Sequence, residues 1–168
     1  MAAAELSPGL TARQCGACGA SALKLDDYRQ WRERQPASGP VTEPAARAEE
    51  EQDVRARTCP ACTRLMQRYR VGTQPDFRLD ACSACQLVWL DRGEWASLAQ
   101  GDLSGRLTEI LSEAWQRRLR ADELRNRREA GLRAKHGDAC IDELIRVRSW
   151  LDAQPQREEL LALLRAGW

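Results

Sequence analysis

Apolar and polar residues alternate through the middle of the chain, from residue 55 to about residue 100. The segments RTCPACTRLMQRYRV and DFRLDACSACQLVWL carry β-branched and aromatic residues around turns, which is typical of short strands. Gly72–Asp76 supplies the residues of a chain reversal between two of them. A helix is predicted after Asp91, which can cap it, with Glu94 three residues later in a capping-box arrangement.

The pattern changes to a helical period from about Leu103 to Lys135. Apolar residues recur there at steps of three and four, which predicts one amphipathic helix: Leu107, Ile110, Leu111, Ala114, Trp115 and Leu119. A second helix is predicted from Asp138 to about Ala153, with Ile141, Leu144, Ile145 and Leu151 on one face. Pro155 suits the first turn of a third helix that ends near Gly167.

The remaining segments divide the chain into modules. Residues 1–13 read as a flexible tail, and residues 14–34 as a C-x2-C turn, here called a knuckle, with a short following stretch. Residues 35–54 hold three prolines and an acidic excess, which is typical of a solvated linker. The predicted fold is therefore a small α+β protein, with a ribbon domain at 55–100 and an all-α region of about three helices at 103–168.

Composition and charge narrow the class of protein. The chain has 43% hydrophobic but only 5% aromatic residues, which favours modest modules over one deep core. The net charge of +1 does not by itself point to nucleic acid or a membrane surface. The sequence holds no apolar run of the roughly 20 residues that a membrane span needs, and its start lacks the features of a secretion signal. We expect a cytoplasmic protein that does not associate with membranes.

Six of the seven cysteines fall into three C-x2-C pairs. Two thiolates on one tight turn can hold one ion, and in a reducing compartment zinc explains the pattern better than disulfides do. Cys59 and Cys62, followed at ribbon spacing by Cys82 and Cys85, predict one tetrahedral Zn²⁺ site. Four thiolates leave no open coordination position, so this zinc is expected to be structural.

The run from Cys59 to Leu98 resembles the small bacterial zinc-ribbon family named for its likeness to the zinc finger of transcription factor IIB. The residues that match the family's pattern are Cys59, Pro60, Cys62, Met66, Asp80, Cys82, Cys85, Trp89, Leu90, Asp91, Gly93 and Glu94. The resemblance covers about residues 58–98 and implies a zinc ribbon of short antiparallel strands, but implies little about activity. Thr63 and Gln86 replace the family's knuckle glycines, so slightly strained turns are expected there.

The side chains of Trp89 and Trp95 can be interpreted in two ways. They could form a platform for stacking nucleic-acid bases. The reading that we favour is packing, one ring over the other, which would shield a ribbon too small to build its own core.

Four candidate ligands remain: Cys15, Cys18, His136 and Cys140. They make up a complete Cys3His set, which predicts a second zinc site joining the two ends of the chain. In one alternative His136 is a solvated residue and Cys140 a small buried hydrophobic one. In another, the first knuckle binds metal together with a second chain.

Eight basic and three acidic residues lie between Arg117 and Lys135, a local net charge of +5. The candidate contact residues are Arg117, Arg118, Arg120, Arg125, Arg127 and Arg128. They suit either nucleic-acid phosphates or a protein interface. The sequence shows no catalytic constellation, so neither an enzyme nor a small-molecule substrate is expected. We favour a zinc-ribbon adaptor that binds a protein, with a link to the transcription or translation machinery as one possibility. A ribbon protein that binds nucleic acid through segment 117–135 is the alternative.

Overall fold

The computed structural model describes residues 1–35, 56–73 and 76–166. The chain divides into two units, Met1–Leu119 and Arg120–Trp168. The first combines a sheet with helices and the second is helical, so the α+β class is confirmed. The predicted linker, apart from residue 35, lies outside the described residues.

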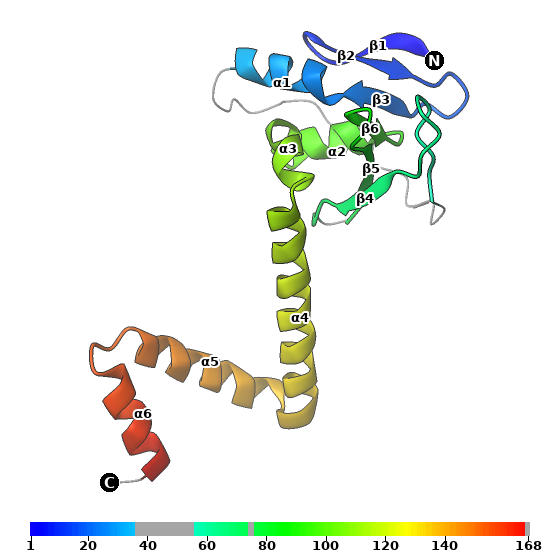
Figure 1. Ribbon diagram of the computed structural model, residues 1–168. Helices are drawn as coiled ribbons and strands as arrows, with labels where there is room; N and C mark the ends of the chain where they lie inside the picture. The colour runs from blue at the N-terminus through cyan, green and yellow to red at the C-terminus, as the bar shows by residue number, and fades with distance from the viewer. Residues whose placement is uncertain (36–55, 74–75, 167–168) are drawn as a thin grey trace. The chain divides into compact units, whose positions relative to one another are not determined.

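A six-stranded antiparallel sheet forms the centre of the first unit (Figure 1). Its strand order is β1-β2-β3-β6-β5-β4. The strands are β1 (Ala2–Ser7), β2 (Leu10–Gln14), β3 (Ser21–Lys24), β4 (Gln67–Arg70), β5 (Arg78–Cys82) and β6 (Leu87–Leu90). β4 and β5 pair antiparallel on either side of the predicted reversal.

The prediction of a flexible tail at residues 1–13 is wrong, because these residues form the hairpin of β1 and β2. Leu10 and Ala12 are buried while Thr11 and Arg13 between and after them are exposed, so β2 has the alternation of a half-buried strand. Gly9 has a φ of 79° at the hairpin turn, a conformation that glycine adopts readily.

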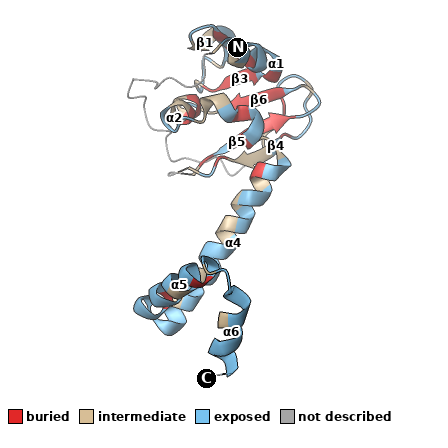
Figure 2. Ribbon diagram, turned by 90° about the vertical axis from the view of Figure 1, so that its left-hand side faces the viewer, coloured by how far each residue is buried: buried red, intermediate tan, exposed pale blue. Residues whose placement is uncertain are grey.

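The helices α1 (Leu25–Arg34), α2 (Glu94–Gln100) and α3 (Leu107–Ile110) contribute to one large core cluster with one face of the sheet. Figure 2 shows how strongly burial concentrates on the central strands. The Tyr28 hydroxyl donates to the Ser104 carbonyl at 2.9 Å and accepts from the Leu107 amide at 3.0 Å. This pair of hydrogen bonds holds α1 to the segment that begins α3.

A second, smaller core cluster holds side chains from the same strands at alternating positions. Trp89 and Leu87 belong to it, whereas Val88 and Leu90 belong to the larger cluster. Side chains of successive strand residues point to opposite faces, so the two clusters lie on the two faces of the sheet. The smaller cluster contains Cys59 and Cys82 and therefore includes the predicted metal site.

The sheet consists of two matching three-stranded halves, an internal repeat that the sequence analysis did not detect. In each half two strands are followed by a C-x2-C turn, a third strand and then a helix. Ala22 and Trp89 stand at the same position after Cys15 and Cys82, and these two residues pair with each other in the β3–β6 ladder. An approximate two-fold axis at the Ala22–Trp89 pair thus exchanges the halves.

The predicted helix at 103–135 is broken into two helices, α3 and α4 (Glu113–His136). The break occurs at Leu111–Ser112 because the Ser112 hydroxyl accepts from the Trp115 amide at 3.2 Å, as an N-capping side chain does. The first turns of α4 belong to the first unit. There the Gln116 side chain hydrogen bonds to both backbone groups of Arg70 and so caps the edge strand β4.

The second unit contains the rest of α4 together with α5 (Asp138–Asp152) and α6 (Arg157–Ala166), close to the predicted helices. Among its described residues only Ile141 and Leu151 are buried. Leu144 and Ile145, predicted on the same apolar face, are 57% and 44% exposed. No helix among the described residues is long and apolar enough to cross a membrane.

Candidate metal centre

The four cysteines of the predicted ribbon site converge in the first unit. Cys59 and Cys62 come from the turn before β4, Cys82 ends β5, and Cys85 lies in the turn between β5 and β6. Their four sulfur atoms all lie within 4.8 Å of one another, and the Cys62 and Cys82 sulfurs are 3.6 Å apart. Within the described residues, this is the one group of three or more candidate ligands that approaches so closely.

The distances fit a tetrahedral metal ion. Metal–sulfur bonds of about 2.3 Å to the corners of a tetrahedron place neighbouring sulfurs about 3.8 Å apart. The observed separations reach that value with small movements of the thiols. Cys59 and Cys82 are buried and Cys62 and Cys85 half-buried, so the cluster is partly shielded from solvent.

Hydrogen bonds between the thiols shift the pKa values of two of these cysteines in opposite directions. A hydrogen bond from the Arg64 amide, with a further bond from the Cys85 thiol, lowers the pKa of Cys62 to about 7. The hydrogen bond that Cys85 makes to Cys62, together with burial, raises the pKa of Cys85 to about 12. A divalent ion would displace the remaining protons and convert the cluster to four thiolates.

Two knuckle residues adopt a left-handed backbone without being glycine, as the sequence predicts. Thr63 has a φ of 61° and Gln86 a φ of 49°. The Thr63 amide donates to the Cys59 carbonyl at 2.9 Å, which closes the turn that carries both thiols. This conformation is disfavoured for a β-branched residue, so Thr63 carries local strain.

A network of charged side chains connects the segments that carry the four cysteines. Asp80 is buried and accepts hydrogen bonds from Arg57 and Arg68, each at 3.2 Å. Arg57 continues to Asp91 at 3.0 Å and stacks on the Trp89 ring, 4.9 Å from its centroid. This network joins the segment before the Cys59–Cys62 knuckle to the strands on either side of the Cys82–Cys85 knuckle. Asp80 belongs to the family pattern seen in the sequence, whereas Arg57 was not predicted, because its only signal is its place two residues before Cys59.

Trp89 and Trp95 both pack, as favoured, but they do not pack on each other. Trp89 lies in the cluster of the metal site and donates from its indole to Asp91 at 2.8 Å. Trp95 lies in the larger cluster on the other face, edge-on to Trp31 with ring centroids 5.8 Å apart. The alternation of side chains along β6 and the turn of α2 send the two rings to opposite faces.

Glu94 is buried beside this network, and the predicted capping box is half formed. One oxygen of its carboxyl group accepts from the Asp91 amide at 2.8 Å, but the Asp91 side chain binds Arg57 and Trp89 in place of the helix end. Burial is the main cause that raises the pKa of Glu94 to about 8, and the nearby charges of Asp91 and Asp80 add to it. The carboxyl group of Glu94 thus favours its protonated form up to a higher pH than an exposed glutamate does.

The first knuckle, Cys15–Gly19, has the same backbone hydrogen bonds as the Cys59–Thr63 knuckle. The Cys15 amide donates to Ala20 at 2.8 Å and the Gly19 amide to Cys15 at 2.9 Å. Cys15 is half-buried and Cys18 exposed. Hydrogen bonds from the amides of Cys18 and Ala17 and from the Cys18 thiol lower the pKa of Cys15.

His136 ends α4 and Cys140 lies in the first turn of α5, and both are exposed, so Cys140 is not the buried residue of the alternative reading. They belong to the second unit, whereas Cys15 and Cys18 belong to the first. The joint Cys3His site stays a prediction.

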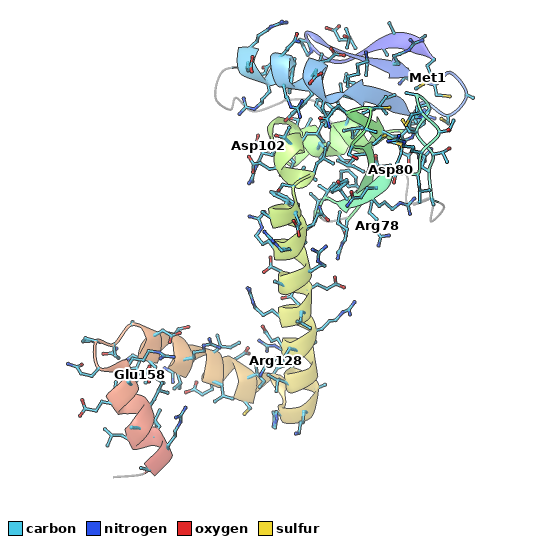
Figure 3. All side chains as sticks on the ribbon, in the orientation of Figure 1. Met1, Arg78, Asp80, Asp102, Arg128 and Glu158 are labelled. Carbon is cyan, nitrogen blue, oxygen red and sulfur yellow. The ribbon has the colours of Figure 1, made fainter. Side chains whose placement is uncertain are left out.

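All six candidate arginines of α4 are exposed. Figure 3 shows side chains projecting from all sides of α4, among them the labelled Arg128. Arg117 pairs with Glu113 at 3.7 Å and Arg125 with Asp122 at 3.3 Å, while Arg118 stacks on Trp115 at 4.3 Å. The structure therefore places several of these arginines in contacts along the helix itself.

Comparison with known proteins adds no relative to this picture. No family model, no curated protein and no solved structure matches the chain.

Proposed function

We propose that this chain is a zinc-ribbon adaptor, in which a structural zinc ion stabilises the first unit and the helices of the second unit bind a protein. Cys59, Cys62, Cys82 and Cys85 would hold the ion, and zinc is the natural occupant because four soft thiolates in a tetrahedron suit it. The ion would supply no reaction, since its coordination shell is full.

The observation that carries the binding role is the apolar surface of the second unit. Five large apolar side chains there are at least 44% exposed: Leu124, Leu144, Ile145, Trp150 and Leu164. Scattered apolar residues are common on surfaces, but here the exposed ones greatly outnumber the buried pair Ile141 and Leu151. A helical unit of this composition gains stability when a partner covers it.

The metal assignment is tested by measuring the zinc content of purified protein. We expect loss of one zinc per chain in Cys82→Ser, with a lower melting temperature. Retention of the full zinc content by this variant would refute the assignment, because three thiolates alone hold zinc far less tightly.

The binding role is tested by comparing proteins that co-purify with the tagged chain from its own host. We expect one partner to be lost when Leu144 and Ile145 are both changed to serine. The matched control changes Glu143 and Arg146, which pair with each other on the same helix, to serine. The partner should survive this control and nuclease treatment. A partner lost equally in both variants would argue against the apolar surface.

Nucleic-acid binding is the second candidate, and the exposed arginines of α4 are the observation in its favour. A binding titration across a salt series separates the candidates. Phosphate contacts would give a steep salt dependence that charge reversal at Arg117, Arg118 and Arg120 abolishes. Lack of binding at low salt would remove this candidate.

A further inference from the structure

The first knuckle occupies the place in its half of the sheet that the Cys82–Cys85 knuckle occupies in the other half. Both follow the middle strand of their half and precede one of the central strands, β3 or β6. Cys82 pairs with Leu87 across its turn in the way that the Cys15 amide bonds to Ala20. Gly19 has a φ of 73°, the left-handed conformation found also at Thr63 and Gln86.

This knuckle is therefore built like those of the metal centre but has only half of a coordination shell. In the metal centre the Cys82–Cys85 knuckle faces the Cys59–Cys62 knuckle, and the two together supply four sulfurs. β3 and β6 run antiparallel, so the knuckles that precede them lie at opposite ends of the central pair. Cys15 and Cys18 consequently cannot join the four-cysteine cluster, and among the described residues no third ligand group converges on them.

The surroundings of the knuckle leave room for another polypeptide. A side chain built at Gly16 would meet nothing within 4 Å, and Cys18 is exposed. The knuckle residues other than cysteine, Gly16, Ala17 and Gly19, are all small, which lets a second backbone approach closely. The aliphatic part of the Arg92 side chain lies against Gly19 and packs on this side of the knuckle.

We propose that Cys15 and Cys18 form a metal half-site, and that one zinc ion joins it to the same knuckle of a second copy of this chain. The metal centre of each chain is the template, because two C-x2-C knuckles, each followed by a left-handed residue, bring four sulfurs within 4.8 Å of one another there. Two identical knuckles meet naturally about a two-fold axis, where each residue faces its own counterpart. The four thiols release their protons to solvent as the four zinc–sulfur bonds form. This inference rests on the zinc ion proposed for the four-cysteine cluster, but not on the proposed adaptor surface.

The test uses the full chain loaded with zinc, with the mass measured by light scattering and the metal content by elemental analysis. We expect a dimer with about 1.5 zinc ions per chain, since one ion fills each metal centre and one is shared. The double change Cys15→Ser and Cys18→Ser should give a monomer with about one zinc per chain. The zinc that this variant retains also shows that its first unit is folded, so a folding failure is not mistaken for the expected result.

The matched control is Cys140→Ser, which removes an exposed cysteine outside the knuckle. It should keep the dimer and its zinc content. Three results would overturn the proposal. The first is an unmutated monomer with about one zinc, and the second is a dimer that persists without Cys15 and Cys18. The third is a monomer with about two zinc ions that loses one in Cys140→Ser, which would assign the second site to the Cys3His set.

Discussion

The buried carboxyl group of Glu94 makes the stability of the first unit depend on pH in an unusual direction. Its pKa is raised from an ordinary value of 4.5 to about 8, mainly because burial disfavours the charged form. Between these two pH values the unfolded chain has released a proton that the folded chain keeps. The unfolded state then binds fewer protons, so the free energy of unfolding falls as pH rises. The contribution is fully present below pH 4.5 and is lost as the pH rises through about 8.

The size of the effect follows from the shift. Each unit of pKa difference corresponds to about 1.36 kcal/mol, so the full shift sets a ceiling of about 5 kcal/mol. About 2 to 3 kcal/mol of this falls between about pH 6 and about pH 8, a range in which the protein can be handled easily. Glu94→Gln keeps the shape and the acceptor for the Asp91 amide but carries no charge at any pH. In this variant we expect the free energy of unfolding no longer to show the decrease with rising pH that Glu94 causes.

The assay is urea unfolding of the zinc-loaded protein at a series of pH values, with Glu94→Gln beside the unmutated chain. Release of metal on unfolding also varies with pH, but it is common to both proteins and cancels in their difference. Glu113→Gln is the control, since Glu113 has a side chain 78% exposed in the same unit. As the pH rises, the free energy of unfolding of Glu94→Gln should increase relative to that of the unmutated chain. The difference between Glu113→Gln and the unmutated chain should stay constant. Parallel curves for all three proteins would refute the reasoning.

Three further predictions concern the surroundings of the metal centre. Thr63→Gly should raise the free energy of unfolding by about 0.5–1 kcal/mol in urea titrations, because glycine relieves the left-handed backbone; a loss of stability would contradict the strain argument. Asp80→Asn should cost about 3 kcal/mol in the same assay, since it breaks a buried charge network and leaves Arg57 and Arg68 without their shared anion. An unchanged unfolding midpoint would show that this network contributes nothing. Removing zinc with a chelator should lower the melting temperature of the unmutated chain far more than that of Cys82→Ser, and equal shifts would argue against a stabilising ion at this site.

Local patterns were enough to predict the parts of this protein that depend on residues close in sequence. The spacing within Cys59–Cys62 and Cys82–Cys85 identified a cluster that the structure brings together, because a C-x2-C turn fixes two thiols by its own backbone. The apolar period identified α5 and α6 nearly to their ends. The apolar period did not predict the break before α4, because that break depends on a single hydroxyl group, that of Ser112, which caps the new helix.

Tertiary structure alone decided how distant segments combine. The alanine-rich start of the chain reads as a tail because its strand signal is weak, yet it becomes a strand once β2 and the core give it a partner. Pairing of β3 with β6 joins residues far apart in sequence, and no local pattern states that register. That same pairing reveals the two-fold relation between the knuckles, and it places Cys15 and Cys18 away from the four-cysteine cluster. The amino-acid spacing thus determined which residues can hold a metal ion, while the strand register determined which of them can hold one together, because long-range pairing is selected by the packing of the whole sheet.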